Sequence, residues 1–378
     1  MTTTLANLKT PCLLLDQDKM RANQDRMNEI MEKRSVSLRP HLKTLKSVEA
    51  ARYLFKDVKQ PITVSTLKEA REFGRTGFKD ILYAVAMTPQ KLDEVIALRR
   101  DGIDLKILID SEGMADVISQ KSLAEAMPIP TFIEIDVDGH RAGFSFADGD
   151  RLVDVARRLN RHAQLHGIMA HAGESYHLDS AEDLREAALD EANKTLHMAK
   201  KLYDAGIDCP HISIGSTPTA HADIKVGGIT EVRAGVYLFF DLVQAGIGVC
   251  SKTDIALSVL TTVNGYHERR GQIFIDAGWM ALSGDQGTGG QKINQYYGVV
   301  CDEYGNIWPD LVVRNVNQEH GMIIVRPGVE KKLPYLPIGT RLRILPNHAC
   351  ATAAQHEGYH VLNSDNAVVN YWPRIKGW

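Results

Sequence analysis

The chain has 378 residues, of which 44% are hydrophobic and 24% are charged, and its formal net charge is −3 at pH 7. A chain of this kind can bury a large core and is compatible with two domains. The nearly balanced charge, without a run of Lys or Arg, argues against a nucleic-acid partner and favours a small-molecule ligand. We expect a cytoplasmic protein without a membrane segment, because no signal peptide and no stretch of about 18 apolar residues is apparent. Five scattered cysteines without a CxxC pair argue against a disulfide framework.

The first part of the chain alternates between strand-like and helix-like segments. An isolated strand is predicted at Pro11–Leu15, before a helix at Lys19–Lys33. Eight β-rich segments then alternate with amphipathic stretches, which predicts a (β/α)8 barrel of parallel strands. The predicted strands are Val36–Arg39, Ile62–Ser65, Ile81–Val85, Leu105–Ile109, Phe132–Val137, Gly167–His171, His211–Ile214 and Glu231–Leu238. The predicted helices include Ser47–Phe55, Leu67–Gly74, Pro89–Arg100, Leu152–Ala163 and Ala181–Ala205.

The pattern changes after Gly246, where helical periodicity nearly vanishes and β-branched segments recur. These segments are Ile255–Val263, Gln272–Asp276, Tyr297–Cys301, Met322–Val325 and Arg341–Leu345. We therefore expect an α/β chain with a TIM-like (β/α)8 barrel over residues 18–245. A C-terminal, mainly-β domain over residues 246–378 is expected to take up the N-terminal strand within residues 1–17.

Reactive side chains gather in the loops after the predicted barrel strands, where barrel enzymes place their active sites. His41 and Lys43 follow the first strand, Arg141 follows the fifth, and the loop His171–Tyr176 follows the sixth. A partly desolvated lysine beside other cations can have a lowered pKa and form an imine, which makes Lys43 a candidate for covalent catalysis. The alternative is a solvated loop lysine without a function. His41 either orients such an imine, or relays a proton, or packs as an ordinary histidine.

The segment Gly215–Thr219 follows the seventh strand and offers hydroxyls and backbone N–H groups where barrels commonly bind phosphate. The alternative is a turn in which Ser216 or Thr217 caps the next short helix. Arg141 either meets a phenolate oxygen or carboxylate or forms a salt bridge at the rim.

A His-x-Cys pair, His348 and Cys350, follows the last predicted strand of the β-domain. Residues two apart on an extended chain point to the same side and can share one soft metal ion. The alternative is a cysteine that packs beside a hydrogen-bonded histidine. His320 either belongs to the same site or marks a turn.

The segment Pro40–Thr44, with the pattern P-H-x-K-T, resembles the cofactor-lysine motif of the alanine-racemase-like pyridoxal phosphate enzymes. Nearly the whole chain resembles bacterial D-threonine aldolase. The segments that carry this wider resemblance are Ile62–Ala70, Asp80–Ala84, Gly215–Thr219, Glu231–Tyr237 and Leu345–Cys350. It implies a barrel with a C-terminal β-domain, a homodimer, pyridoxal 5'-phosphate and a divalent metal. Manganese is the favoured metal, and zinc and magnesium are alternatives.

The resemblance also implies a role for individual residues. Lys43 would carry the cofactor, and Arg141 would face its phenolate oxygen. Taking the resemblance together with the loop positions, we expect Lys43, His171 and His41 as catalytic residues; Lys43, Arg141, Tyr176, Gly215, Ser216, Thr217 and Tyr237 as cofactor-binding residues; and His348 and Cys350 as metal ligands. The second metal ligand is an aspartate in some relatives and a cysteine in D-serine dehydratases, so Cys350 leaves the branch of the family open. A thiolate suits zinc, whereas manganese prefers harder ligands.

The expected function is metal-dependent aldol cleavage of D-threonine, and of other D-β-hydroxy-α-amino acids, to glycine and an aldehyde. The metal would lower the pKa of the substrate β-hydroxyl, with His171 or a metal-bound water as the base. The alternatives are a D-serine or D-threonine dehydratase, which expels the β-hydroxyl as water, and a D-3-hydroxyaspartate aldolase. A non-catalytic pyridoxal phosphate carrier would leave a β-domain of about 130 residues unexplained. A metal-dependent hydrolase would need clusters of His and Asp that the barrel segments do not contain.

Overall fold

The computed structural model describes residues 4–378, which divide into two compact units. The α/β unit comprises Arg26–Gly235 with Gly377–Trp378, and the β unit comprises the segment up to Asp25 with Val236–Lys376. Helix α1 (Gln17–Arg34) therefore begins in one unit and ends in the other. Among residues 4–378, no helix combines the length and the apolar character that crossing a membrane requires.

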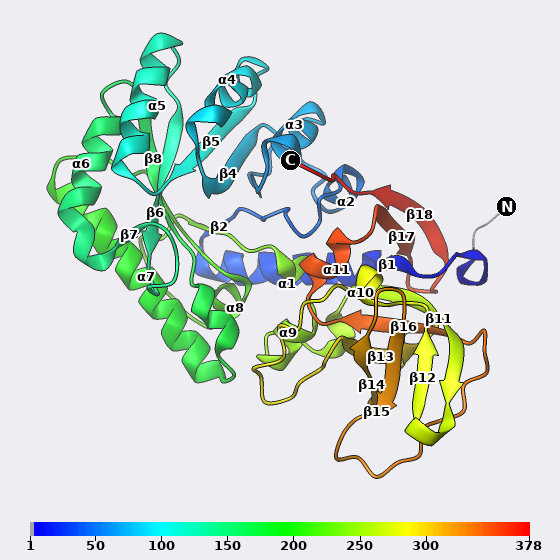
Figure 1. Cartoon of the computed structure of the whole chain (residues 1–378). Helices are drawn as coiled ribbons and strands as arrows, with labels where there is room; N and C mark the ends of the chain where they lie inside the picture. Colours follow the sequence, from blue (N-terminus) through cyan, green and yellow to red (C-terminus); the bar gives the residue numbers. More distant parts are fainter. Residues whose placement is uncertain (1–3) are drawn as a thin grey trace. The chain divides into compact units, whose positions relative to one another are not determined.

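Eight parallel strands, in the order β2-β10-β9-β8-β6-β5-β4-β3, form the sheet of the α/β unit (Figure 1). A parallel bridge between His41 and Thr63 joins the chain after β2 to β3, so that hydrogen bonds connect the two ends of the sheet. The predicted TIM-like barrel is confirmed. Its strands are β2 (Ser37–Leu38), β3 (Ile62–Val64), β4 (Asp80–Ala86), β5 (Asp104–Ile109), β6 (Pro130–Asp136), β8 (Gln164–Ala170), β9 (His211–Ile214) and β10 (Glu231–Val232), and the short β7 (Phe144–Ser145) pairs with β6.

The helices of this unit begin at hydroxyl caps. The side chains of Ser47, Thr66 and Ser180 each accept a hydrogen bond from the third residue of the helix that follows, which satisfies a backbone N–H that has no partner within the helix. Helices α5 to α7 follow one another around the outside of the strands (Figure 1). The helices are α2 (Val48–Leu54), α3 (Leu67–Arg75), α4 (Leu92–Arg100), α5 (Glu112–Ala124), α6 (Gly149–Leu159), α7 (Ala181–Asp204) and α8 (Thr217–His221).

The predicted strand Glu231–Leu238 is wrong beyond Val232, where β10 ends. Gly235 lies so close to the chain after β2 that a Cβ atom on it would be 2.7 Å from the carbonyl oxygen of His41. Val236–Leu238 then forms a 3-10 helix and belongs to the β unit. The local pattern of apolar residues indicates a strand, but this close approach and the turn end it.

A network of ion pairs fills the barrel at the amino ends of its strands. Arg39 is 2% exposed, and its guanidinium binds Glu231 (Nε–Oε2, 2.7 Å) and Asp80 (Nη1–Oδ1, 2.6 Å). The Lys106 amine binds Asp80 (2.7 Å) and Asp104 (2.6 Å). Because both cations have carboxylate partners, their burial is compensated. The opposite, carboxyl ends of the strands are left for the candidate site.

The β unit is a sheet of nine strands in the order β12-β15-β14-β13-β16-β11-β1-β17-β18, and a further pairing of β11 with β12 closes six of them into an antiparallel barrel. Strand β1 (Cys12–Asp16) pairs with β11 (Leu257–His267) and with β17 (Gly358–Leu362). The expected uptake of the N-terminal strand is therefore confirmed. The other strands are β12 (Gln272–Ile275), β13 (Gly298–Asp302), β14 (Ile307–Val316), β15 (Gly321–Val325), β16 (Arg341–Pro346) and β18 (Val368–Pro373), and the helices are α9 (Leu242–Gly246), α10 (Trp279–Leu282) and α11 (Ala349–Ala354).

Candidate active site

The chain after β2 holds His41 and Lys43 at the carboxyl end of the barrel. The backbone N–H of His41 donates to Ala234 (2.7 Å), and its Nδ1 accepts a hydrogen bond from the backbone N–H of Lys43 (3.4 Å). The neighbouring Leu42 is fully buried, whereas Lys43 is exposed, so the partial desolvation of Lys43 suggested by the sequence is not found. The lysine amine is accessible for a covalent bond.

Burial, followed by the positive charges of Lys43 and Arg233, holds the pKa of His41 well below its usual value. The ring is therefore neutral near pH 7, which agrees with its Nδ1 being an acceptor. A neutral ring beside Lys43 can accept a proton but carries no charge of its own.

His171, the residue after β8, is held in one tautomer. Its Nδ1 lies 2.8 Å from the carbonyl oxygen of Gly215, and since a carbonyl only accepts, Nδ1 must carry the proton. Burial, and next the charges of Arg141 and Lys43, hold the pKa of His171 well below its usual value. The ring is therefore neutral and leaves Nε2 as an unprotonated acceptor, as a general base requires.

Arg141 and Tyr176 lie beside His171. A Cβ atom on Gly173 would be 3.2 Å from Nε of Arg141, so the loop after β6 contacts the loop after β8. The Tyr176 ring stacks on the His171 ring, with centroids 6.3 Å apart and an interplanar angle of 29°. The structure thus brings three of the predicted site residues together, and Arg141 is exposed at the rim.

The segment after β9 forms the predicted turn. Gly215 has φ +131°, and a Cβ atom there would lie 2.3 Å from the carbonyl oxygen of Arg233, so only glycine fits. Ser216 caps α8, since its hydroxyl accepts from Thr219 N (3.3 Å) and its backbone N–H donates to Thr219 Oγ1 (3.1 Å). Thr217 is 1% exposed, and its hydroxyl is buried without a hydrogen-bond partner in the described chain.

The helix cap, one of the two sequence interpretations of this segment, is confirmed at Ser216, and phosphate binding stays a prediction. The Ser216 hydroxyl bonds within the cap, whereas the Thr217 hydroxyl has no hydrogen-bond partner among residues 4–378. An unsatisfied buried hydroxyl costs free energy unless a ligand completes it. With the exposed amine of Lys43 in the same unit, these residues fit a phosphate-bearing aldehyde cofactor.

Two buried charged residues that organise this region were not predicted from the sequence. Glu191 on α7 accepts hydrogen bonds from the backbone of Ala172 (3.0 Å) and Gly215 (2.9 Å) through Oε1, and from the Thr219 hydroxyl (2.7 Å) through Oε2. Arg233 donates to the carbonyl of Ala170 (2.6 Å). In sequence, Glu191 looks like any other acidic residue of a charged helix, so nothing marked it as buried. Arg233, by contrast, lies within a motif that carried the family resemblance.

The β unit contains the His-x-Cys pair. Nδ1 of His348 binds Oδ2 of Asp285 at 2.6 Å, the carboxylate–histidine arrangement that orients metal-binding imidazoles, so Nε2 is the ring nitrogen that can face Cys350 or a metal. Asp241 is 1% exposed and accepts the backbone N–H of Ala349 (2.9 Å), which lies between the two predicted ligands. Asp285 and Asp241 were not predicted, because they lie far from His348 in sequence.

The charge around His348 also fits a cation. Burial lowers its pKa, but the hydrogen bond to Asp285, together with a hydrogen bond to Cys350 and the charge of Asp241, outweighs burial and raises the pKa to about 11. His348 and Cys350 are thus in contact. Among residues 4–378, no group of three or more His, Cys, Asp or Glu side chains is arranged to hold a metal.

Two other predicted residues lie in the β unit. The hydroxyl of Tyr237 donates to Gln24 (2.6 Å), and the ring is fully buried, so its expected contact with the cofactor stays a prediction. His320 is exposed at the turn between β14 and β15, where its carbonyl accepts the backbone N–H of Asn317 (2.8 Å). Its position is that of a turn residue.

Both units match known protein families in sequence. Residues 15–243 match the family described as alanine racemase, N-terminal domain, and residues 256–362 match the putative serine dehydratase domain. The chain is 46% identical to D-threo-3-hydroxyaspartate dehydratase of Delftia sp. (strain HT23), with 100% of each chain covered. It is 32% identical to D-serine dehydratase of Dictyostelium discoideum, covering 98% of each, and 27% identical to D-threonine aldolase of Arthrobacter sp, covering 97% of this chain and 92% of that protein.

A solved structure of the Delftia sp. HT23 dehydratase superimposes with a TM-score of 0.95 at 45% identity, covering 99% of this chain and 100% of that chain. The whole architecture is therefore shared with a pyridoxal phosphate enzyme family. The chain belongs to the alanine-racemase-like, fold type III pyridoxal phosphate enzymes, in the family that contains the D-serine dehydratases and D-threonine aldolases.

Proposed function

We propose that this chain is a pyridoxal phosphate- and divalent-metal-dependent lyase that removes water from a D-β-hydroxy-α-amino acid of the 3-hydroxyaspartate type. The observation that carries the proposal is 46% identity, over the whole of both chains, to a D-threo-3-hydroxyaspartate dehydratase. D-threonine aldolase activity, the function expected from the sequence, has weaker support, because the D-threonine aldolase of Arthrobacter sp is only 27% identical to this chain.

The metal assignment has separate support. D-threo-3-hydroxyaspartate dehydratase has been solved as histidine-to-alanine and cysteine-to-alanine variants two positions apart, and the cysteine variant is in a metal-free form. His348 and Cys350 have the same spacing here and share a hydrogen bond. A thiolate and an imidazole suit zinc better than manganese, so we propose zinc as the preferred metal.

The residues of the chain divide the work as follows. Lys43 would hold the cofactor, the Thr217 hydroxyl and the Gly215 turn would hold its phosphate, and His348 with Cys350 would hold the metal. The bound cofactor would supply an electron sink at the substrate Cα, and the bound metal a Lewis acid for the β-hydroxyl. Nε2 of His171, unprotonated and fixed by Gly215, would accept a proton from the substrate.

Product analysis tests the proposal directly. Purified enzyme with cofactor and metal is given D-threo-3-hydroxyaspartate, D-serine or D-threonine, with the L-isomers as controls. Dehydration releases ammonia and a 2-oxo acid from each D-substrate, whereas aldol cleavage of D-threonine releases glycine and acetaldehyde. We expect ammonia and oxaloacetate from 3-hydroxyaspartate. Glycine as the main product would overturn the dehydratase assignment.

The cofactor lysine is tested with a matched pair of variants. Lys43→Ala should lose the visible absorbance of the bound cofactor, its trapping by borohydride and all turnover. Lys46→Arg, three residues later, keeps a cation for its ion pair with Glu69 (3.0 Å) and should retain all three. Trapping on any residue other than Lys43 would contradict the assignment.

A further inference from the structure

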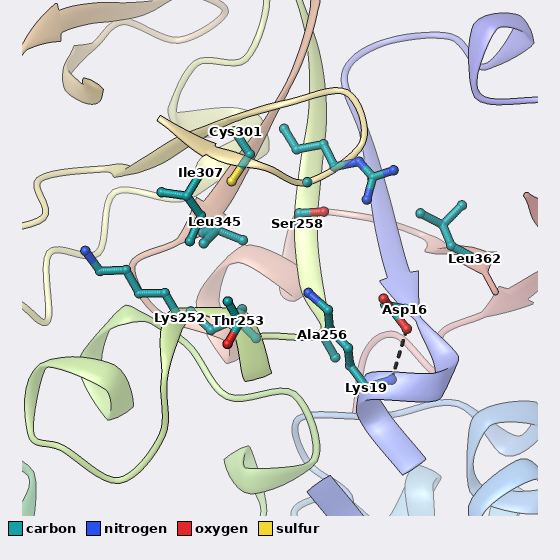
Figure 2. A pocket seen from close by; sticks show the side chains of 13 residues that line it. Asp16, Lys19, Lys252, Thr253, Ala256, Ser258, Cys301, Ile307, Leu345 and Leu362 are labelled. Carbon is teal, nitrogen blue, oxygen red and sulfur yellow. Dashed lines mark hydrogen bonds between the residues drawn. The ribbon is translucent and has the colours of Figure 1, made fainter. Parts of the chain in front are cut away.

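A small cavity in the β unit is lined by more cations than carboxylates (Figure 2). It has a volume of about 50 Å³, which is room for a few waters or one small ion, since one water needs about 10–15 Å³. Its charged lining consists of Lys19, Lys252 and Arg343 against the single carboxylate of Asp16. Three positive charges against one negative charge leave a net charge of +2.

The carboxylate of Asp16 accepts hydrogen bonds from the backbone. Oδ1 of Asp16 accepts the backbone N–H groups of Asp18 (3.0 Å) and Lys19 (3.0 Å) at the start of α1. The cations have no equivalent partners: neither the Lys19 amine nor the Lys252 amine forms an ion pair within the described part of the chain. Figure 2 shows the Lys19 side chain extending from α1 toward Ser258 on β11.

Arg343, on β16, is the strongest sign that the cavity has an occupant. The residue is 6% exposed, and its Nη2 donates to Oδ1 of Asn366 (2.7 Å), but its Nε is buried without a hydrogen-bond partner. A buried guanidinium with an unsatisfied N–H is destabilising unless a ligand or counter-ion completes its hydrogen bonds. By contrast, the buried guanidinium of Arg39 has two carboxylate partners.

The remaining lining groups do not supply the missing negative charge. Burial raises the pKa of the Cys301 thiol to about 12, so that it stays neutral. Burial, and next the charge of Arg326, lowers the pKa of Lys252, as expected for a cation that lacks a counter-ion.

We infer that this cavity binds one small inorganic oxyanion, which the guanidinium of Arg343 and the amines of Lys19 and Lys252 hold. The anion would connect the start of α1 with β11, β13 and β16, because its lining residues come from those elements and from the turn at Lys252–Asp254. The site is independent of the proposed reaction, since none of its residues belongs to the proposed cofactor or metal sites.

The test is calorimetric titration of inorganic phosphate into the holoenzyme at constant ionic strength. The wild type should show one saturable site. Lys252→Gln and Lys19→Gln should each weaken the Kd at least about tenfold, the loss expected for one charge-assisted hydrogen bond. Lys332→Gln is the matched control, because it removes one exposed cation of the same unit outside the cavity, and it should leave the Kd unchanged.

Two results would overturn the inference. One is the absence of saturable binding to the wild type, which would mean that water fills the cavity. The other is an equal Kd in the wild type, Lys252→Gln and Lys332→Gln, which would assign the phosphate to another site. Crystals soaked in selenate give an independent answer, because an anomalous peak is expected beside Arg343.

Discussion

Replacement of Glu191 by leucine is expected to loosen the turn that the phosphate of the cofactor is proposed to contact. Glu191 is 1% exposed and accepts three hydrogen bonds, from the backbone N–H groups of Ala172 and Gly215 and from the Thr219 hydroxyl. Leucine leaves the two backbone donors buried without an acceptor, at about 1–3 kcal/mol each, and leaves the Thr219 hydroxyl with only its contact to the Ser216 hydroxyl (3.1 Å). Removal of a carboxyl whose pKa burial raises offsets part of this loss. We expect the free energy of unfolding to fall by about 3–5 kcal/mol.

Glu191→Gln separates the hydrogen bonds from the charge. Its amide oxygen can keep the bonds from Ala172 and Gly215, so the expected loss is only about 1 kcal/mol from the changed contact with Thr219. Because the loosened turn includes Gly215, the leucine variant should also bind pyridoxal phosphate at least about tenfold more weakly than the glutamine variant, which corresponds to 1.4 kcal/mol.

Denaturant unfolding followed by circular dichroism measures the stability, and titration of the cofactor absorbance measures its affinity. Glu186→Leu is the control, since Glu186 is exposed on the same helix, and both quantities should stay within error of the wild type. Equal losses in the leucine and glutamine variants, or a loss below about 1 kcal/mol in the leucine variant, would refute the idea that the buried carboxylate organises this turn.

Three further predictions concern the histidines and the metal pair. His171→Gln should lower kcat by about 10²–10⁴-fold while the cofactor absorbance stays, because only the proposed base is lost; an unchanged kcat in steady-state assays would exclude that role. Cys350→Asp should move the metal preference from zinc toward manganese, measured by activity after chelation and reconstitution with each metal; an unchanged order would count against Cys350 as a ligand. Burial, and next the charge of His211, lowers the pKa of His166 from 6.5 to about 4. Between pH 6.5 and pH 4 the unfolded chain therefore binds more protons than the folded chain, and the free energy of unfolding falls as the pH falls. In His166→Gln, urea unfolding from pH 4 to 6.5 should show a slope smaller by up to about 1.4 kcal/mol per pH unit, and an unchanged slope would contradict the assignment.

The barrel could be predicted because its strands carry their own signal. Leu82, Leu108, Phe132 and Met169 form one buried cluster from four neighbouring strands, and each lies in an apolar run bounded by polar turns. In the β unit, by contrast, β14 was missed because Pro309 and Asp310 disfavour a strand locally, although β13 and β15 pair with it on both sides. Strand β17 was missed as well, and one of its partners, β1, comes more than 300 residues earlier in the chain.

Some residues of the candidate site could also be predicted from the sequence, and others could not. Residues that would touch a ligand, such as Lys43 and Thr217, follow predicted strands in short motifs, and the order of elements indicates where they gather. Residues that act through others have no such signal. Glu191 belongs to a charged helix, and Asp285 is 63 positions before its partner His348, so only the folded chain reveals what they hold.

The positive charges near His171 determine when this proposed base can accept a proton. The cations Arg141 and Lys43 reinforce the effect of burial in lowering the pKa of His171, so the ring is a weak base in the protein alone. A phosphate dianion held near Thr217 and a substrate carboxylate would each offset part of that positive charge. Offsetting it raises the pKa of His171 toward the pH at which proton transfer is efficient. Because the same cations attract the anionic ligands, His171 would be an effective base only when cofactor and substrate are bound.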